Sequence, residues 1–430
     1  MDKKRKRKKL WILYLCMWVV IAALNAAAWN STAFCDWYIA HVFPVWVGTY
    51  GRLTGLFPFS VGEWMLAAGL ALVTAAVLLG IAWAAVRLCS VIQDCWKKKA
   101  SGERKGERGT LGQADRYAGF ERGVRRFFLF FAWTFLGVCL IMTLNCFILY
   151  HASTFSEHYF GENDREYTLE ETIRLYNMVA EECNRLSQCI QRDGTGMAVY
   201  VSAKKGNDAG GEAAAMADTA RMVMKSLGAE YPQLDGYYPR PKALFFSDFM
   251  CQQYMQGYYF PFSMEANYND VMHILNIPST MCHELAHLRG YIFEDEANFI
   301  GYLACVRSED EFFQYAGYLS VLNYLYNDLV KARKGNPEAF EAAAERVPPA
   351  AISEQVWEDN IFVTEEEWNR INESALIDTE VVDKAADVFI DTNLKVNGVS
   401  DGKVSYSRVV RLLLQYYYAE GAKWPAGVEE

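Results

Sequence analysis

The sequence predicts an α+β protein that is mostly helical, with three N-terminal transmembrane helices followed by an extracytoplasmic domain. Three observations support this prediction: three long apolar runs near the N-terminus, basic residues clustered beside two of them, and a largely helical pattern after residue 151. The chain has 430 residues, 52% of them apolar or aromatic, which suffices for a large core and for more than one structural unit.

The apolar runs cover about residues 10–29, 64–86 and 127–150, and none of them contains Asp, Glu, Lys or Arg. Each run is long enough to cross a hydrocarbon core of about 30 Å as a helix. Residues 1–150 are therefore expected to form a membrane anchor and residues 151–430 a separate domain. Burial of these runs in a soluble core is the alternative.

The basic residues predict how the chain crosses the membrane. Seven of them precede the first run and ten lie in the segment 97–126, whereas Arg52 is the one basic residue between the first two runs. Basic flanks favour the cytoplasmic side, so the N-terminus and the 97–126 loop are expected in the cytoplasm and the C-terminal domain outside the cytoplasmic membrane. A signal peptide cut near residues 26–28 is the alternative for the first run, and it leaves the domain on the same side.

The charge differs strongly between the two parts of the chain. Residues 1–126 hold 19 Lys/Arg and 8 Asp/Glu, a net charge of +11, while the remainder holds 23 and 44, a net charge of −21. The split indicates two environments, with the lipid bilayer as partner of the first part. The acidic remainder argues against nucleic acid as a partner.

The C-terminal part mixes helices with a few short strands. Thr168 with Glu171 forms a capping box that opens an amphipathic helix of about 24 residues. Residues 197–201 and 242–246 read as strands, and residues 257–269 as another that is broken at Pro261. Beyond this region nearly all of the chain has helical character, so the domain is expected to be dominated by helices.

The sequence HELAH, residues 283–287, matches the pattern H-E-x-x-H. Residues four apart lie on one face of a helix, so His283 and His287 can both approach one zinc ion at about 2.0–2.1 Å. Glu284 lies beside such an ion, where its carboxylate can take a proton from a water that the metal activates. A buried helix with satisfied histidines is the alternative.

A catalytic zinc ion needs a third protein ligand, for which Glu294 and Glu296 compete. Glu294 is favoured because Asn298 lies one turn further on its face, where the amide can orient an imidazole, whereas Glu296 points about 200° away. The remaining alternative is that these acidic residues simply form a charged, solvent-exposed face of a helix. Phe293 stands where another class of zinc peptidases has a third histidine, which excludes that class.

These residues resemble known families. Glu294-x-x-Ala297-Asn298 after HELAH resembles the E-x-x-A-[DN] arrangement of glutamate-zincin metallopeptidases, in which that glutamate is the third ligand. From Leu10 to about Tyr416, the chain also resembles the bacterial membrane family called domain of unknown function 3810. The motifs that carry this resemblance are the three spans, PFSVGEW, GYYFPFSMEAN, HELAHLRG, EDEANF and DTNLKVNGVSDGKVSY. The resemblance implies a zincin-like extracytoplasmic domain.

Two further segments are candidates for the site. The stretch 257–269 resembles the strand upstream of the active-site helix in zincins, which makes Tyr258, Phe260 and Phe262 possible substrate-binding residues, with a packing hairpin as the alternative. Tyr406 is a possible oxyanion donor, although buried aromatic packing is the favoured explanation in a chain with 26 tyrosines.

We therefore expect a membrane-anchored zinc metallohydrolase, most simply a peptidase with a peptide or protein substrate. His283, His287 and Glu294 would hold Zn²⁺, and Glu284 would act as general base. One rival is a binding or sensory membrane protein with a structural zinc site, against which the intact Glu284 argues. Another rival is a cell-wall amide hydrolase with the same chemistry.

The predicted topology can be tested with reporter fusions. Because the basic residues cluster before the first and third runs, a reporter fused after Glu430 should behave as extracytoplasmic and one inserted near Gly109 as cytoplasmic. Paired alkaline phosphatase and fluorescent protein fusions measure both positions. A C-terminal reporter that is active in the cytoplasm would overturn the compartment assignment.

Overall fold

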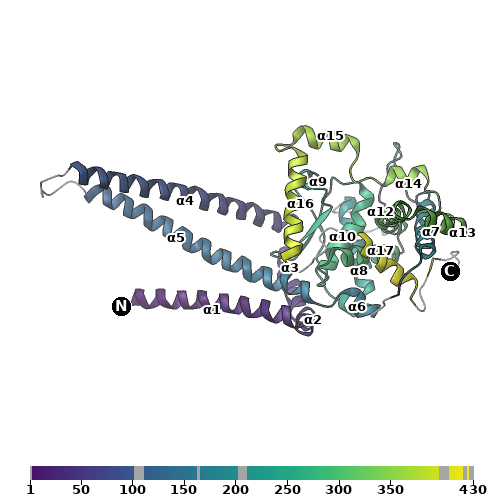
Figure 1. Cartoon of the computed structure of the whole chain (residues 1–430), viewed down its shortest axis with the longest axis horizontal. Coiled ribbons are helices and arrows are strands. Elements are labelled where there is room, and N and C mark those ends of the chain that lie inside the picture. Colours follow the sequence, from purple (N-terminus) through teal and green to yellow (C-terminus); the bar gives the residue numbers. More distant parts are fainter. Residues whose placement is uncertain are drawn as a thin grey trace. The chain divides into compact units, whose positions relative to one another are not determined.

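The computed structural model describes residues 2–100, 111–161, 165–201, 211–396, 406–419 and 424–425 (Figure 1). The chain divides into two compact units. The first comprises residues 1–25 and 62–143, and the second, here called the globular unit, comprises residues 26–61 and 144–430. The predicted fold class is confirmed at the level of a mostly helical chain with three apolar helices near the N-terminus.

The first unit consists of long apolar helices. These are α1 (Asp2–Asn30), which continues into the globular unit, α4 (Val61–Ala100) and α5 (Leu111–Met142). The stretches long and apolar enough to cross a membrane are Arg7–Asn30, Val61–Ile92 and Ala118–His151, which contain the three predicted runs. Within the unit, the Asn25 side chain donates a hydrogen bond to the Thr143 hydroxyl at 3.0 Å and links α1 to the end of α5.

The basic segment 97–126 is more helical than the sequence indicated. We expected a loop, but α4 continues to Ala100 and α5 begins at Leu111, which leaves residues 101–110 outside the described part of the chain. Lys and Arg are good helix formers, so each apolar helix can continue into the basic residues beside it.

The globular unit includes two segments that precede residue 151. Residues 26–61 contribute α2 (Thr32–His41) and α3 (Phe43–Thr54), and residues 144–150 follow α5. Cys35, Tyr38 and Phe43 are buried in the same core as the C-terminal helices. The boundary expected at residue 150 therefore does not separate the compact units, because apolar side chains between the first two runs help to build the core of the second unit.

The core of the globular unit is formed by helices that pack around α10 (Ile277–His287) and α11 (Glu294–Val306). Thr168 and Glu171 form the predicted capping box at the start of α7, Leu169–Leu186, which is shorter than the expected 24 residues. The remaining helices are η1 (Thr143–Phe147), η2 (Leu149–His151), α6 (Phe155–Tyr159), α8 (Gly211–Leu227), η3 (Pro232–Leu234), α9 (Ser247–Cys251), η4 (Ile274–Asn276), α12 (Glu311–Gly335), α13 (Pro337–Arg346), α14 (Glu354–Asp359), α15 (Glu365–Ser374), α16 (Thr379–Val396) and α17 (Tyr406–Tyr417).

A small sheet lies against α10. It consists of β1 (Lys242–Ala243), β2 (Gly257–Phe260) and β3 (Glu265–Tyr268) in the order β1-β3-β2. β1 runs parallel to β3, while β2 and β3 form an antiparallel hairpin in which Gly257 faces Tyr268 and Phe260 faces Glu265. The break expected at Pro261 is thus the turn of this hairpin.

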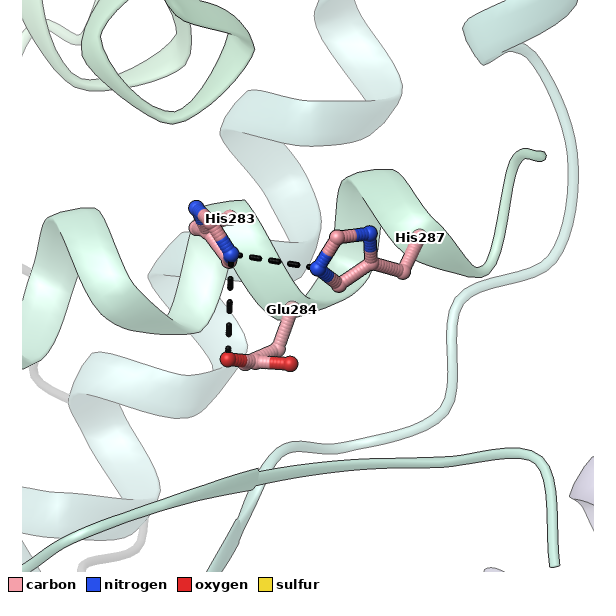
Figure 2. A group of neighbouring side chains, drawn as sticks. All are labelled: His283, Glu284 and His287. Carbon is pink, nitrogen blue, oxygen red and sulfur yellow. Dashed lines mark hydrogen bonds and ion pairs between the residues drawn. The ribbon is translucent and has the colours of Figure 1, made fainter. Parts of the chain in front are cut away.

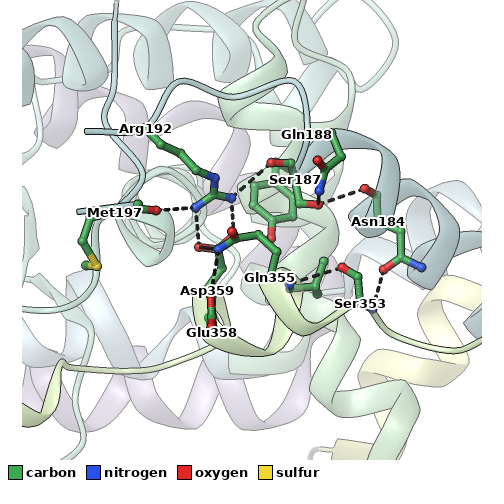
Figure 3. Close-up of polar contacts among 12 residues, drawn as sticks. Asn184, Ser187, Gln188, Arg192, Met197, Ser353, Gln355, Glu358 and Asp359 are labelled. Atoms are coloured by element: carbon green, nitrogen blue, oxygen red, sulfur yellow. Dashed lines mark hydrogen bonds and ion pairs between the residues drawn. The ribbon is translucent and has the colours of Figure 1, made fainter. Parts of the chain in front are cut away.

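The strand expected at 197–201 was wrong. Only an isolated bridge between Arg192 and Ala198 is present there. Arg192 instead anchors this segment through a bidentate ion pair with the buried Asp359, at 2.9 and 2.6 Å, and the Tyr315 hydroxyl donates to the same carboxylate at 2.8 Å (Figure 3). A charged side-chain contact rather than a ladder of backbone bonds fixes the segment.

A buried ion pair joins the sheet to the segment before α4. Lys242 and Glu265 form this pair, and the Lys242 ammonium also donates to the carbonyl oxygens of Thr54 and Phe59 at 2.9 and 3.0 Å. The backbone N–H of Val61 donates to Glu265 at 3.2 Å. Both charges are therefore paired and hydrogen-bonded, as buried charges require.

α10 and α11 cross very closely at Gly301. A Cβ atom at this position would lie 2.9 Å from the Ser279 carbonyl oxygen and 3.2 Å from the His283 nitrogen. Both neighbours belong to the backbone of α10, so they cannot move away as a flexible side chain could. Only glycine permits this separation of the two helices.

Replacing Gly301 should therefore disturb the helix crossing. Gly301→Val should destabilise the globular unit by about 1–3 kcal/mol, the usual cost of overpacking, and lower the midpoint of its thermal unfolding in detergent. Gly335→Ala in α12 is the matched control, because its Cβ would meet no atom within 4 Å. Equal unfolding midpoints for the two variants would show that the crossing tolerates a side chain.

Candidate metal centre

The candidate site is built on the last two turns of α10. His283 and His287 project from one face of this helix, and their Nε2 atoms lie 3.1 Å apart (Figure 2). Glu284 follows on the adjoining face, with its Oε1 4.0 Å from the His283 Nε2. Donor atoms of these three residues all lie within 4.8 Å of one another, as they do in groups that hold a metal ion.

The chain turns back sharply after α10 and brings a fourth side chain to the site. Gly290 has a φ of +93°, a conformation that glycine adopts readily, and Phe293 is extended with a φ of −75° and ψ of 130°. Glu294 is the first residue of α11, so its position depends on this turn. Its Oε2 lies 3.0 Å from the His283 Nε2 and its Oε1 3.9 Å from the His287 Nε2.

Hydrogen bonds at the outer ring nitrogens fix the two imidazoles. The His283 Nδ1 lies 2.9 Å from the Asn298 Oδ1, and the His287 Nδ1 lies 2.7 Å from the Tyr291 carbonyl oxygen. The Asn298 amide in turn donates to the Tyr324 hydroxyl at 3.3 Å. Both acceptors are oxygens, so each imidazole donates its Nδ1–H and keeps a lone pair on Nε2, the pattern typical of metal-binding histidines.

The residues fit a zinc ion. Two nitrogens bound to one tetrahedral ion at 2.0–2.1 Å stand about 3.3 Å apart, close to the observed separation of 3.1 Å between the two Nε2 atoms. Two lone pairs and a carboxylate that face one another at such distances repel each other unless a cation or a proton lies between them. Glu294 lies on the solvent-exposed side of the candidate site, with a side chain that is 59% accessible, so an ion can enter there.

The two histidines have pKa values shifted in opposite directions, and only His283 favours a positive charge. Burial disfavours the charged form of His283, but the hydrogen bond and the charge of Glu294 outweigh burial and raise its pKa to about 9. Burial lowers the pKa of His287 to about 4, against the opposing charge of Glu294. A proton on His283 thus occupies the place in which a metal ion could balance the same carboxylate.

Glu284 is buried and incompletely bonded. Its side chain is 3% exposed, and burial raises the pKa of its carboxyl to about 8. The Oε2 atom has no hydrogen-bond partner among the described residues. A buried carboxylate oxygen without a partner costs free energy, which is expected where a water molecule or substrate is bound.

A second glutamate at the start of α11 points away from the histidines. Glu296, the alternative third ligand, accepts hydrogen bonds from the backbone N–H groups of Phe155 and Ser156 at the start of α6. It is 3% exposed, and burial raises its pKa to about 7. The geometry therefore directs Glu294 toward the histidines and Glu296 toward α6.

The strand β2 passes directly beside Glu284, although not with the side chains that the sequence suggested. A Cβ atom on Gly257 would lie 2.8 Å from the Glu284 Oε1, and the Tyr259 ring lies 6.0 Å from the His287 ring. Because side chains alternate along a strand, Tyr258 and Phe260 point to the opposite face, where Phe260 packs against Phe262 with ring centroids 5.4 Å apart. Alternation along GYYF places Tyr259 on the same face as Gly257, so the sequence contained a signal for Tyr259.

Tyr150 was also missed. It comes from the end of the third apolar run, and its ring packs edge-on against Phe293, the residue before Glu294, with ring centroids 5.6 Å apart. No local pattern points to such a contact across more than 140 residues. Tyr406 begins α17, but its side chain lies outside the described part of the structure, and its expected role as an oxyanion donor stays a prediction.

The fold and the site define a class of protein: a mostly helical globular unit with an HExxH motif, in a chain that carries three apolar helices compatible with a membrane anchor. Residues 38–414 match the model of the family described as a protein of unknown function (DUF3810), and the chain belongs to this family. No curated protein and no solved structure is significantly similar to the chain.

A matched pair of variants tests the role of Glu294. Glu294→Gln should weaken zinc binding by more than the 10–100-fold that the loss of an outer hydrogen-bond partner usually costs, because it removes a charged ligand. Glu296→Gln should keep zinc, since its carboxylate bonds to α6. Zinc affinity of the purified full chain, measured by competition with a chelating dye, separates the two. Retention of zinc by both variants would remove this segment from the site.

Proposed function

We propose that the protein is a membrane-anchored zinc metallopeptidase whose globular unit works outside the cytoplasmic membrane. The observation that carries the proposal is the convergence of two Nε2 lone pairs and the Glu294 carboxylate, with an incompletely bonded Glu284 beside them. His283, His287 and Glu294 would hold the ion. When bound, zinc supplies a positive charge that makes water a better nucleophile and polarises a carbonyl group.

Glu284 would move the proton. Its pKa of about 8 keeps this carboxyl within reach of both protonation states near neutral pH, as a group that first accepts and then releases a proton requires. In hydrolysis the carboxylate accepts a proton from the attacking water, and the carboxylic acid delivers it to the amine that leaves. Burial of the group excludes bulk water, so the proton goes to the substrate.

The position of β2 supports a peptide substrate. In the described strand order β1-β3-β2 this strand lies at the edge of the sheet, the position at which an extended chain would add. Gly257 brings the strand into direct contact with Glu284 without a side chain between them. A peptide added at this edge would run past the candidate metal ligands, which favours peptide bonds over other amides as the substrate.

The proposed mechanism predicts a separation of zinc binding from hydrolysis. Glu284→Gln should fold and bind about one zinc ion per chain, because the amide keeps the shape and Glu284 is not a ligand. Hydrolysis should fall by roughly a hundredfold or more, the usual contribution of a positioned general base. The assay is cleavage of a broad peptide library by the purified full chain, with zinc content measured on the same samples.

His283→Ala is the control, and it should lose both zinc and hydrolysis. Equal hydrolysis by wild type and Glu284→Gln would disprove the mechanism. Zinc binding without hydrolysis in wild type would instead favour a structural metal site.

A further inference from the structure

Two segments of the globular unit that adjoin the apolar helices are bonded to the β2–β3 hairpin. The Asn145 side chain, which follows α5, donates to the Pro261 carbonyl oxygen at 2.8 Å, and the Tyr259 hydroxyl donates to the Asn145 carbonyl oxygen at 3.1 Å. The hairpin is also tied to the start of α4, where the Val61 N–H donates to Glu265 at 3.2 Å. All of these residues belong to the globular unit, and both connections lie at the turn of the hairpin.

The distance from this turn to the site is short. From Phe260 at the turn to Gly257 beside Glu284, the strand advances three residues, which corresponds to about 10 Å. Tyr150, the last residue of the third apolar run, packs against Phe293, next to Glu294. The segments that adjoin the second and third apolar helices therefore contact the globular unit within roughly 10–15 Å of the candidate metal centre.

The same edge of the globular unit exposes apolar side chains. Leu53, Leu56 and Phe57 are 55%, 78% and 45% exposed, and they precede Val61 by only a few residues. Trp29, at the end of the first run, is 58% exposed and lies 4.4 Å from His151, ring centroid to ring centroid. Exposed apolar and aromatic side chains beside the ends of membrane helices are typical of contact with the lipid interface.

We propose that the substrate of the site is a polypeptide segment held at the membrane surface, a few residues from its own membrane anchor. The inference rests on the proposed peptidase function and on the crossing of the membrane by the apolar helices. An extended chain covers about 3.3–3.6 Å per residue, so a segment needs about 3–5 residues to reach the site from the membrane surface. A scissile bond about 4–8 residues from the anchor could then reach the site, whereas the anchor would not help to bring a more distant bond to it.

The test compares anchored and free substrates with the full zinc-loaded chain in lipid vesicles. One library carries a transmembrane helix followed by about 30 randomised residues, and a second library has the same randomised residues without the helix. Cut positions, mapped by mass spectrometry and corrected with Glu284→Gln vesicles, should concentrate about 4–8 residues from the helix, and free peptides should be cut at least tenfold more slowly.

The outcomes distinguish the inference from the proposed function. Cuts spread evenly along the anchored segment, or equal cleavage of the free library, would overturn the inference and leave the peptidase function intact. Cleavage of neither library by zinc-loaded wild type would overturn both.

A second readout does not depend on activity. A fluorescent amino acid placed at Phe262, in the hairpin turn, should be quenched by spin-labelled lipids in the same vesicles. The control is Glu338 on α13, an exposed position at the end of the globular unit opposite α3 in Figure 1, and a label there should not be quenched. Absence of quenching at Phe262, as at Glu338, would place the hairpin away from the lipid and overturn the inference.

Discussion

The candidate site depends on how closely α10 and α11 cross. At Gly301 the backbone of α11 touches the backbone of α10 at Ser279 and His283, and no side chain separates the helices. This approach sets the distance from Glu294 and Asn298, on one helix, to His283 on the other. Both polar contacts therefore depend on this one close packing of the helices, so a change of side-chain volume at the crossing should also disturb the site.

Burial and charge act in opposite directions within the site. The apolar surroundings favour neutral forms of His287 and Glu284, while the partly exposed Glu294 keeps a negative charge close to both histidines. A metal ion in this place would add positive charge without a proton. The unpartnered Glu284 Oε2 is a cost to stability that the surrounding core must offset.

The sequence predicted those features of the structure that depend on local patterns. The three apolar helices, the capping box at Thr168, the hairpin break at Pro261 and the shared face of His283 and His287 all follow from spacing within one or two turns. The preference for Glu294 over Glu296 also followed from helical spacing and stays a prediction, while Glu294 lies beside His283 and Glu296 bonds to α6. Tyr150, Tyr259 and the share of residues 26–61 in the globular core depend on contacts between distant segments, which no local pattern reports.

The buried Lys242–Glu265 ion pair has a consequence for how the chain matures. Its partners include the carbonyl oxygens of Thr54 and Phe59, which are synthesised about 200 residues before Glu265. At a synthesis rate of 5–20 residues per second, the segment 26–61 stays without these partners for roughly 10–40 s. Two further apolar helices are synthesised during that time. The apolar residues of this early segment therefore stay without their core partners until both further apolar helices have been synthesised.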